Sequence, residues 1–124
     1  MSKRKLLLVD DDRALGGMLK LKLEKAGNYD VTYSPDGHRI VELAREGKPD
    51  LVILDIDMPG TDGGEARAAL KESPDTKAIP VLFLSSLVTP ENVAASDGLI
   101  GGQEMASKRM ELSDLISRVE SMLT

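Results

Sequence analysis

The sequence predicts an α/β domain built on a mainly parallel sheet. Short apolar runs of strand length alternate with amphipathic stretches of helical length, which is the pattern of repeated β/α units. The runs at residues 6–9 and 51–54 contain only Leu, Val and Ile, as expected for strands covered by helices on both faces. The chain has 124 residues, a length that suits one hydrophobic core. We therefore expect residues 1–124 to form a single domain.

The first predicted helix follows the strand at residues 6–9. Apolar residues recur there at helical spacing, and Gly27–Asn28 provides the end of the helix because glycine readily adopts the conformations that terminate one. The apolar positions form two neighbouring rows, Ala14, Met18 and Leu21 in one and Leu15, Leu19 and Leu23 in the other.

Two more strands are predicted in the first half of the chain. Residues 29–34 form the second strand, with Val31 and Tyr33 on one face. After a turn, a helix with an apolar face ends at Gly47. The apolar run at residues 51–54 is the third strand, and its lack of polar residues predicts burial on both sides.

A loop, a short helix and a fourth strand come next. Residues 58–64 are rich in Gly, Pro and Asp, which predicts a loop. The short helix after it stops at Ser73–Pro74, since the residue before a proline avoids helical conformation. Residues 79–84 predict the fourth strand, with Pro80 near its start, where a missing N–H does least harm.

The pattern is weaker from residue 89 onward. A helix opens near Pro90, but the following stretch is interrupted by glycines. We expect residues 103–107 to form the fifth strand, at the edge of the sheet. The last helix is clear, because its apolar positions share one face: Leu112, Leu115, Ile116, Val119, Met122 and Leu123.

Composition excludes several classes of function. With 16 Lys+Arg against 21 Asp+Glu, a net charge of −5 and three aromatics (two Tyr and one Phe), the chain lacks what a nucleic-acid surface needs. The absence of Cys excludes disulfides and thiolate catalysis, and a single His argues against zinc. The apolar run at 6–9 is too short for a signal peptide or a membrane span. We therefore expect a cytoplasmic protein that binds neither nucleic acid nor membrane.

Polar residues stand directly after the apolar runs, where ligands of open α/β sheets bind. If the strand order is the flavodoxin-like 2-1-3-4-5, Asp10, Asp11 and Asp55 converge, because the first and third strands are neighbours. Carboxylates so close raise one another's pKa unless a cation joins them, and Mg²⁺ suits a site with few carboxylates. Lys108, after the fifth strand, would add a fixed positive charge for a phosphoryl group.

Each of these residues also has a purely structural interpretation. The Asp10–Asp12 triplet suits the start of a helix, Ser85 suits a capping hydroxyl, and Lys108 suits a surface lysine. Asp55 is harder to explain in this way, because an aspartate directly after an apolar strand is costly to bury without a partner. The joint placement of all four at strand ends favours a site.

The chain resembles, over essentially its whole length, the receiver domain of bacterial two-component response regulators, including the single-domain chemotaxis type. The resemblance lies in residues 6–12 (LLLVDDD), 51–63 (LVILDIDMPGTDG) and 79–85 (IPVLFLS), the middle motif being the most specific. It implies a flavodoxin-like (βα)5 three-layer sandwich around a parallel five-stranded sheet of order 2-1-3-4-5.

The resemblance also implies roles for the residues at the strand ends. Asp55 would be the phospho-acceptor, Asp10 and Asp11 the acidic pair that holds Mg²⁺, and Ser85 the switch hydroxyl. Asp57 would lend its backbone carbonyl to the metal, and Lys108 would pair with the phosphoryl group. The implied donor is a sensor histidine kinase, a phosphotransfer protein or a small donor such as acetyl phosphate. A downstream protein target or an output domain would read the signal, so the protein is a switch that catalyses only its own phosphorylation and dephosphorylation.

Three departures from the family pattern concern the end of the chain. Arg109 follows Lys108 where the family usually has a proline with a cis bond, so we expect a trans peptide here, and the reach of Lys108 depends on a turn without that proline. Met105 replaces the usual Tyr or Phe, so aromatic coupling to Ser85 is absent or replaced by a looser thioether contact. The glycines between Ser85 and Lys108 predict a short fourth helix and an atypical output surface.

Two other functions fit part of the sequence. Asp55-Ile56-Asp57 is similar to the Asp-x-Asp nucleophile motif of haloacid-dehalogenase-like phosphatases, but there the nucleophile strand comes first, whereas here Asp10 and Asp11 precede it. A degenerate receiver would keep the fold and bind partners without cycling phosphate. A phosphohistidine role for His38 has no supporting motif, and we expect this side chain at the surface.

Overall fold

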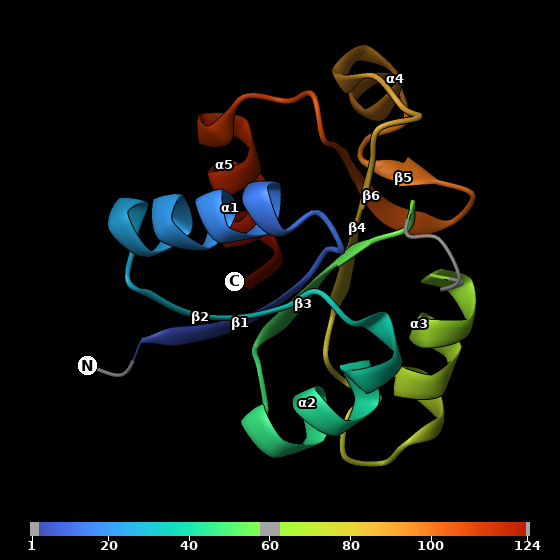
Figure 1. Cartoon of the computed structure of the whole chain (residues 1–124). Coiled ribbons are helices and arrows are strands. Elements are labelled where there is room, and N and C mark those ends of the chain that lie inside the picture. The colour runs from blue at the N-terminus through green and yellow to red at the C-terminus, as the bar shows by residue number, and fades with distance from the viewer. Residues whose placement is uncertain (1–2, 58–62, 124) are drawn as a thin grey trace.

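The chain folds as six strands in one sheet, in the order β2-β1-β3-β4-β6-β5, with helices on both faces (Figure 1). This computed structural model describes residues 3–57 and 63–123, so most of the loop predicted at 58–64 lies outside the described residues. The elements are β1 Arg4–Val9, α1 Arg13–Ala26, β2 Tyr29–Ser34, the 3-10 turn Gly37–Arg39, α2 Ile40–Gly47, β3 Leu51–Asp55, α3 Gly63–Glu72, β4 Val81–Ser85, α4 Pro90–Ala95, β5 Leu99–Ile100, β6 Gln103–Ser107 and α5 Leu112–Leu123.

The five predicted strands pair in parallel in the predicted order, β6 being the fifth of them. The prediction that this strand lies at the edge was wrong, because β5 pairs with it antiparallel on the outside. Gly101 and Gly102, with φ of 61° and 78°, form the two-residue turn between β5 and β6. Positive φ at both central positions is what a tight hairpin requires, and glycine adopts it without strain.

Helices α1 and α5 cover one face of the sheet, and α2 and α3 lie on the other (Figure 1). Successive residues of a strand point to opposite faces, so Leu6 and Leu8 pack under α1 and α5 while Leu7 and Val9 pack on the α2–α3 side. All four side chains are buried. The uninterrupted apolar run therefore reflects burial on both faces, which confirms the three-layer prediction.

Only one of the two apolar rows on α1 faces the sheet. Leu23 is fully buried, whereas Met18 and Leu21 are 42% and 59% exposed. Each residue advances an α-helix by about 100°, so the row that begins at Ala14 is turned by that angle from the row that begins at Leu15. The sheet covers only the row that begins at Leu15. The sequence pattern alone did not distinguish the two rows.

Two predicted boundaries move by one or two residues. Helix α3 begins at Gly63, inside the predicted loop, and β4 begins at Val81 rather than Ile79. Pro80 has no N–H to donate to the sheet, but its carbonyl still accepts from Val52 N at 3.0 Å. The strand ladder therefore starts one residue after the proline.

Gly16→Ala tests how closely α1 packs on the sheet. A Cβ at Gly16 would lie 2.2 Å from the Tyr33 ring, and that ring is held because its hydroxyl donates to Asp10 O at 2.6 Å. We expect Gly16→Ala to lower the free energy of unfolding by about 1–3 kcal/mol, measured by urea denaturation. At Gly17, where a Cβ meets nothing within 4 Å, the same change should raise stability by about 0.5–1 kcal/mol. Equal effects at both positions would contradict this packing.

The fourth helix is short, as predicted, and hydrogen exchange tests whether its region is also less protected than α5. Helix α4 has six residues and buries Val93, whereas α5 has twelve and buries Leu115 and Val119. We expect amides of residues 90–102 to exchange about tenfold or more faster than those of the α5 core, because few buried contacts oppose local opening there. Equal protection in the two segments would contradict the prediction.

Candidate functional site

The carboxylates of Asp10, Asp11 and Asp55 meet at the carboxyl ends of β1 and β3. Val9 pairs with Leu54 in the sheet, so the residues that follow them leave the two strands side by side. One carboxylate oxygen from each aspartate lies within 4.8 Å of the others. Asp10 and Asp55 are 0% and 1% exposed, whereas Asp11 is exposed. The structure thus brings together the three carboxylates that the sequence predicted.

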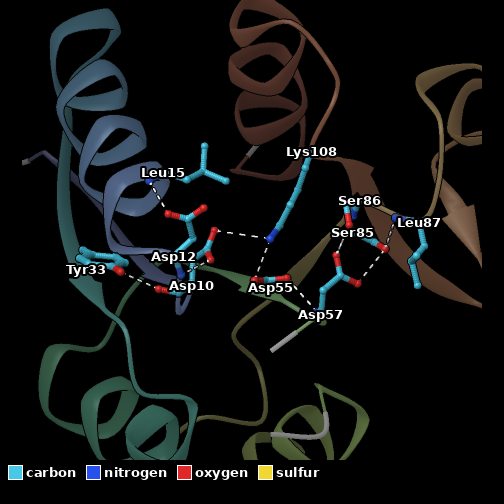
Figure 2. A network of polar contacts seen from close by, with 10 residues as sticks. All are labelled: Asp10, Asp12, Leu15, Tyr33, Asp55, Asp57, Ser85, Ser86, Leu87 and Lys108. Atoms are coloured by element: carbon cyan, nitrogen blue, oxygen red, sulfur yellow. Dashed lines mark hydrogen bonds and ion pairs between the residues drawn. The ribbon is translucent and has the colours of Figure 1, made fainter. Parts of the chain in front are cut away.

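Lys108 reaches this cluster from the end of β6, as Figure 2 shows. Its Nζ lies 2.8 Å from Asp55 Oδ2 and 3.7 Å from Asp10 Oδ2, and its side chain is 15% exposed. The backbone is placed by the sheet, since Lys108 N donates to Ser85 O at 3.0 Å. Burial alone would lower the pKa of Lys108, but the ion pair with Asp55 and the charge of Asp10 hold it above its usual value.

The peptide between Lys108 and Arg109 is trans, as expected, because the described residues contain no cis peptide bond. Lys108 reaches the carboxylates without the proline, since its ammonium lies 2.8 Å from Asp55 Oδ2. Ser107 helps to order this turn, because its hydroxyl accepts from Arg109 N at 3.0 Å and donates to Val88 O at 2.7 Å. The turn therefore keeps Lys108 over the carboxylates without a proline.

Each of the two buried aspartates has one carboxylate oxygen that accepts from a backbone N–H and one that faces Lys108. Asp10 Oδ1 accepts from Asp12 N at 2.9 Å, and Asp55 Oδ1 accepts from Asp57 N at 2.8 Å. Within the described part of the chain, no backbone N–H or hydroxyl donates to Oδ2 of either residue, and both oxygens face the Lys108 ammonium, at 2.8 Å from Asp55 and 3.7 Å from Asp10. Burial, together with the neighbouring charge of Asp55, raises the pKa of Asp10 to about 6.

These features fit a hard divalent cation. Two buried carboxylates beside an exposed third carboxylate provide the oxygen ligands that Mg²⁺ prefers. Asp10, Asp11 and Asp55 are the residues that would hold such an ion. That the Asp57 backbone carbonyl is also a ligand of the metal remains a prediction.

The Asp57 side chain makes contacts that the sequence analysis did not foresee. It turns toward the end of β4, where its Oδ1 accepts from Ser85 Oγ at 3.2 Å (Figure 2). Its Oδ2 accepts from Ser86 N at 2.7 Å and from Ser86 Oγ at 2.9 Å. Burial opposes ionisation, but these hydrogen bonds and the charge of Lys108 lower the pKa of Asp57 below its usual value. The available signal was two consecutive serines at the end of the strand next to that of Asp57.

Other residues singled out in the sequence have structural roles. Asp12 is the N-cap of α1 and accepts from Leu15 N at 3.1 Å. Met105 is buried on the α2–α3 side of the sheet and pairs with Phe83 across β4 and β6. His38 is exposed, which confirms its expected surface position. None of these three side chains adds to the carboxylate cluster.

The arrangement can place a tetrahedral anion between an ammonium and a cation site. Asp55 Oδ2 is buried and has no backbone or hydroxyl donor among the described residues, so a lone pair that does not face Lys108 is available to an electrophile. Lys108 supplies positive charge beside it. Transfer of a phosphoryl group to a carboxylate needs mainly such positioning and charge neutralisation.

Comparison with known proteins agrees with the geometry. The family model described as "Response regulator receiver domain" matches residues 6–120. A curated relative, the DNA-binding dual master transcriptional regulator RpaA of Synechocystis sp., is 32% identical over 120 residues, which are 96% of this chain and 48% of the relative. The chain thus spans about half the length of this relative.

Solved structures of similar chains have the same fold. A putative response regulator from Chloroflexus aurantiacus is 30% identical, with 98% of each chain covered and a TM-score of 0.80. The chemotaxis protein CheY4 of Vibrio cholerae is 26% identical, with 98% of this chain and 100% of that one covered and a TM-score of 0.81.

Within residues 3–57 and 63–123, no helix is both long and apolar enough to cross a membrane.

Lowering the pH should weaken Mg²⁺ binding. The Asp10 carboxylate would be a ligand of the metal, and its pKa of about 6 means that a proton competes for it below that pH. We expect the affinity to be nearly constant above pH 7 and to fall by about tenfold per pH unit below pH 6. Isothermal titration calorimetry between pH 5 and 7.5 measures this, with Glu46→Gln, a change at an exposed position of α2, as control. An affinity that does not change over this range would contradict the prediction.

Proposed function

Because the chain belongs to the response regulator receiver family, we propose that Asp55 accepts a phosphoryl group in a two-component phosphorelay. The observation that supports this most is the position of Asp55 Oδ2. This oxygen is buried, lies 2.8 Å from the Lys108 ammonium, and has no backbone or hydroxyl donor among the described residues. We further propose that residues 1–124 form one receiver domain, since the family match extends over nearly all of them.

The reaction proposed is in-line displacement at phosphorus. The Asp55 carboxylate attacks the phosphoryl group of a phosphohistidine, a P–O bond forms, and the P–N bond breaks as the imidazole leaves. With acetyl phosphate as donor, acetate leaves instead. Lys108, whose ammonium lies 2.8 Å from Asp55 Oδ2, neutralises the oxygens of the transferred group.

Mg²⁺, held by the carboxylates of Asp10, Asp11 and Asp55, would supply further positive charge for the same oxygens. The proposed assignment of the Asp57 backbone carbonyl to the metal rests on the family resemblance. Water later attacks the phosphorus of the acyl phosphate, which releases inorganic phosphate and restores the Asp55 carboxylate. The protein is thus a switch that acts only on its own phosphorylation state.

The phosphoryl charge would be read out at the end of β4. A group with up to two negative charges on Asp55 attracts the Lys108 ammonium and offers acceptors to the Ser85 hydroxyl. Movement at Ser85 changes the loop that leads to α4, and a target protein or output domain would bind the altered surface. A sensor histidine kinase or a phosphotransfer protein is the proposed donor.

The sequence analysis left two alternative functions open, a phosphatase and a degenerate receiver. The haloacid-dehalogenase-like alternative is not supported, since the family model and the similar solved structures are receivers. The degenerate receiver has in its favour that Met105 and Arg109 stand where the family usually has an aromatic residue and a proline. It predicts binding without phosphate transfer, and the following experiment distinguishes the two functions.

Intact mass measurement after incubation with acetyl phosphate and Mg²⁺ tests the proposal. We expect a gain of one phosphoryl group in the wild type and none in Asp55→Asn, because the amide is not a nucleophile. Asp30→Asn, a matched change at an exposed position of β2, should be modified like the wild type. Absence of the shift in the wild type, or its persistence in Asp55→Asn, would refute the assignment.

A further inference from the structure

The hydroxyl of Ser85 has one proton to donate, and in this structure it donates it to Asp57. We propose that the Asp57 carboxylate is a positioning group that competes with a phosphoryl group on Asp55 for the Ser85 hydroxyl, and so stabilises the resting state of the switch. The competition rests on the proposed function, in which Asp55 carries the phosphoryl group. Asp57 acts through Ser85 rather than on the reacting atoms.

Both oxygens of the Asp57 carboxylate are engaged at the end of β4. Oδ1 accepts from Ser85 Oγ, and Oδ2 accepts from the amide and the hydroxyl of Ser86 (Figure 2). Hydrogen bonds to an ionised carboxylate are stronger than those between neutral groups. Ser85 is 1% exposed, so water does not readily replace Asp57 as its acceptor. The resting position of the hydroxyl is therefore specified by a charged partner.

The same hydroxyl also holds the loop after β4. Ser85 Oγ accepts from Leu87 N at 3.0 Å, and the next residue, Val88, accepts from Ser107 Oγ at 2.7 Å. The Leu87 side chain is 84% exposed, so these backbone contacts, rather than packing of that side chain, hold the loop. If the Ser85 side chain turns about χ1 toward another acceptor, its Oγ moves and the Leu87 amide loses its partner. The Asp57 contact therefore couples Ser85 to the conformation of residues 86–88.

Asp57 also contacts the acceptor itself. Its backbone N–H donates to Asp55 Oδ1 at 2.8 Å, while its side chain accepts from Ser85 and Ser86. One residue thus touches both the phosphorylation site and the switch hydroxyl. A phosphoryl group on Asp55 would be opposed by Asp57 in two ways, through the lost Ser85 hydrogen bond and through charge repulsion. The test must separate these two effects.

A double-mutant cycle separates them. The four proteins are the wild type, Asp57→Ala, Ser85→Ala and the double variant, and the probe is beryllium fluoride with Mg²⁺, which mimics a phosphoryl group on a carboxylate. Asp57→Ala keeps the backbone carbonyl and N–H of residue 57. We expect it to tighten beryllium fluoride binding about tenfold when Ser85 is present, the value of one charge-assisted hydrogen bond. With Ser85→Ala, the same change should tighten binding less than about threefold, because only the charge effect remains.

Asp57→Asn provides a second variant that keeps a neutral acceptor of the same shape. It should tighten binding by less than Asp57→Ala when Ser85 is present. Asp30→Asn, the matched exposed change on β2, should bind like the wild type. An equal effect of Asp57→Ala with and without Ser85, or weaker binding in Asp57→Ala, would overturn the proposal.

The resting state can be tested without any phosphoryl mimic. In amide NMR spectra of the protein alone, Asp57→Ala should shift the Ser86 and Leu87 resonances, because Ser86 N loses its acceptor and Ser85 Oγ is free to rotate away from Leu87 N. An unchanged Leu87 amide would refute the contact. A wild type that shows this contact but does not bind beryllium fluoride would refute the proposed function and the competition with it, whereas binding with no coupling to Ser85 would refute the competition alone.

Discussion

Two aspartates buried at the ends of neighbouring strands are the constraint on which the rest of the site depends. Asp10 and Asp55 are almost fully excluded from solvent, and a buried carboxylate is costly unless donors or a cation face it. Backbone N–H groups satisfy one oxygen of each residue, and the Lys108 ammonium lies beside the other. The positive charge of Lys108 does not balance the negative charges of Asp10, Asp55 and the exposed Asp11. This excess of negative charge suits the site to a divalent cation.

The site consists of an ion-pair cluster and a hydrogen-bonded group, which meet at Asp57. The first is the charged cluster of Asp10, Asp55 and Lys108. The second joins the Asp57 side chain to the two serines that end β4 and begin the next loop. Because the Asp57 N–H donates to Asp55, a change of charge in the first group acts directly on the second. The parallel sheet holds the strand ends in place, so a response is confined to the loops beyond them.

Much of the fold could be predicted because strands and helices bury apolar residues with different periods. The runs at residues 6–9 and 51–54 were predictable, since only strands covered on both faces lack polar residues so completely. The exposed row of Met18 and Leu21 was not, because helical spacing shows that residues share a face but not whether anything covers it. Strand β5 has two residues, too few for any periodicity, although Gly101–Gly102 is a turn signal that would have located it.

For the site, the sequence by itself determined which chemical groups end the strands, because an acid, a hydroxyl or a lysine directly after an apolar run is visible without coordinates. It also indicated that Asp10, Asp11 and Asp55 converge, since parallel strands bring their carboxyl ends to one edge. Only the tertiary structure decided where each side chain turns. Asp57 faces Ser85 and Ser86 because β3 and β4 are neighbours in register, and Lys108 reaches Asp55 because β6 lies beside β4. Such contacts depend on rotamers and on residues distant in the chain, which no local pattern of sequence specifies.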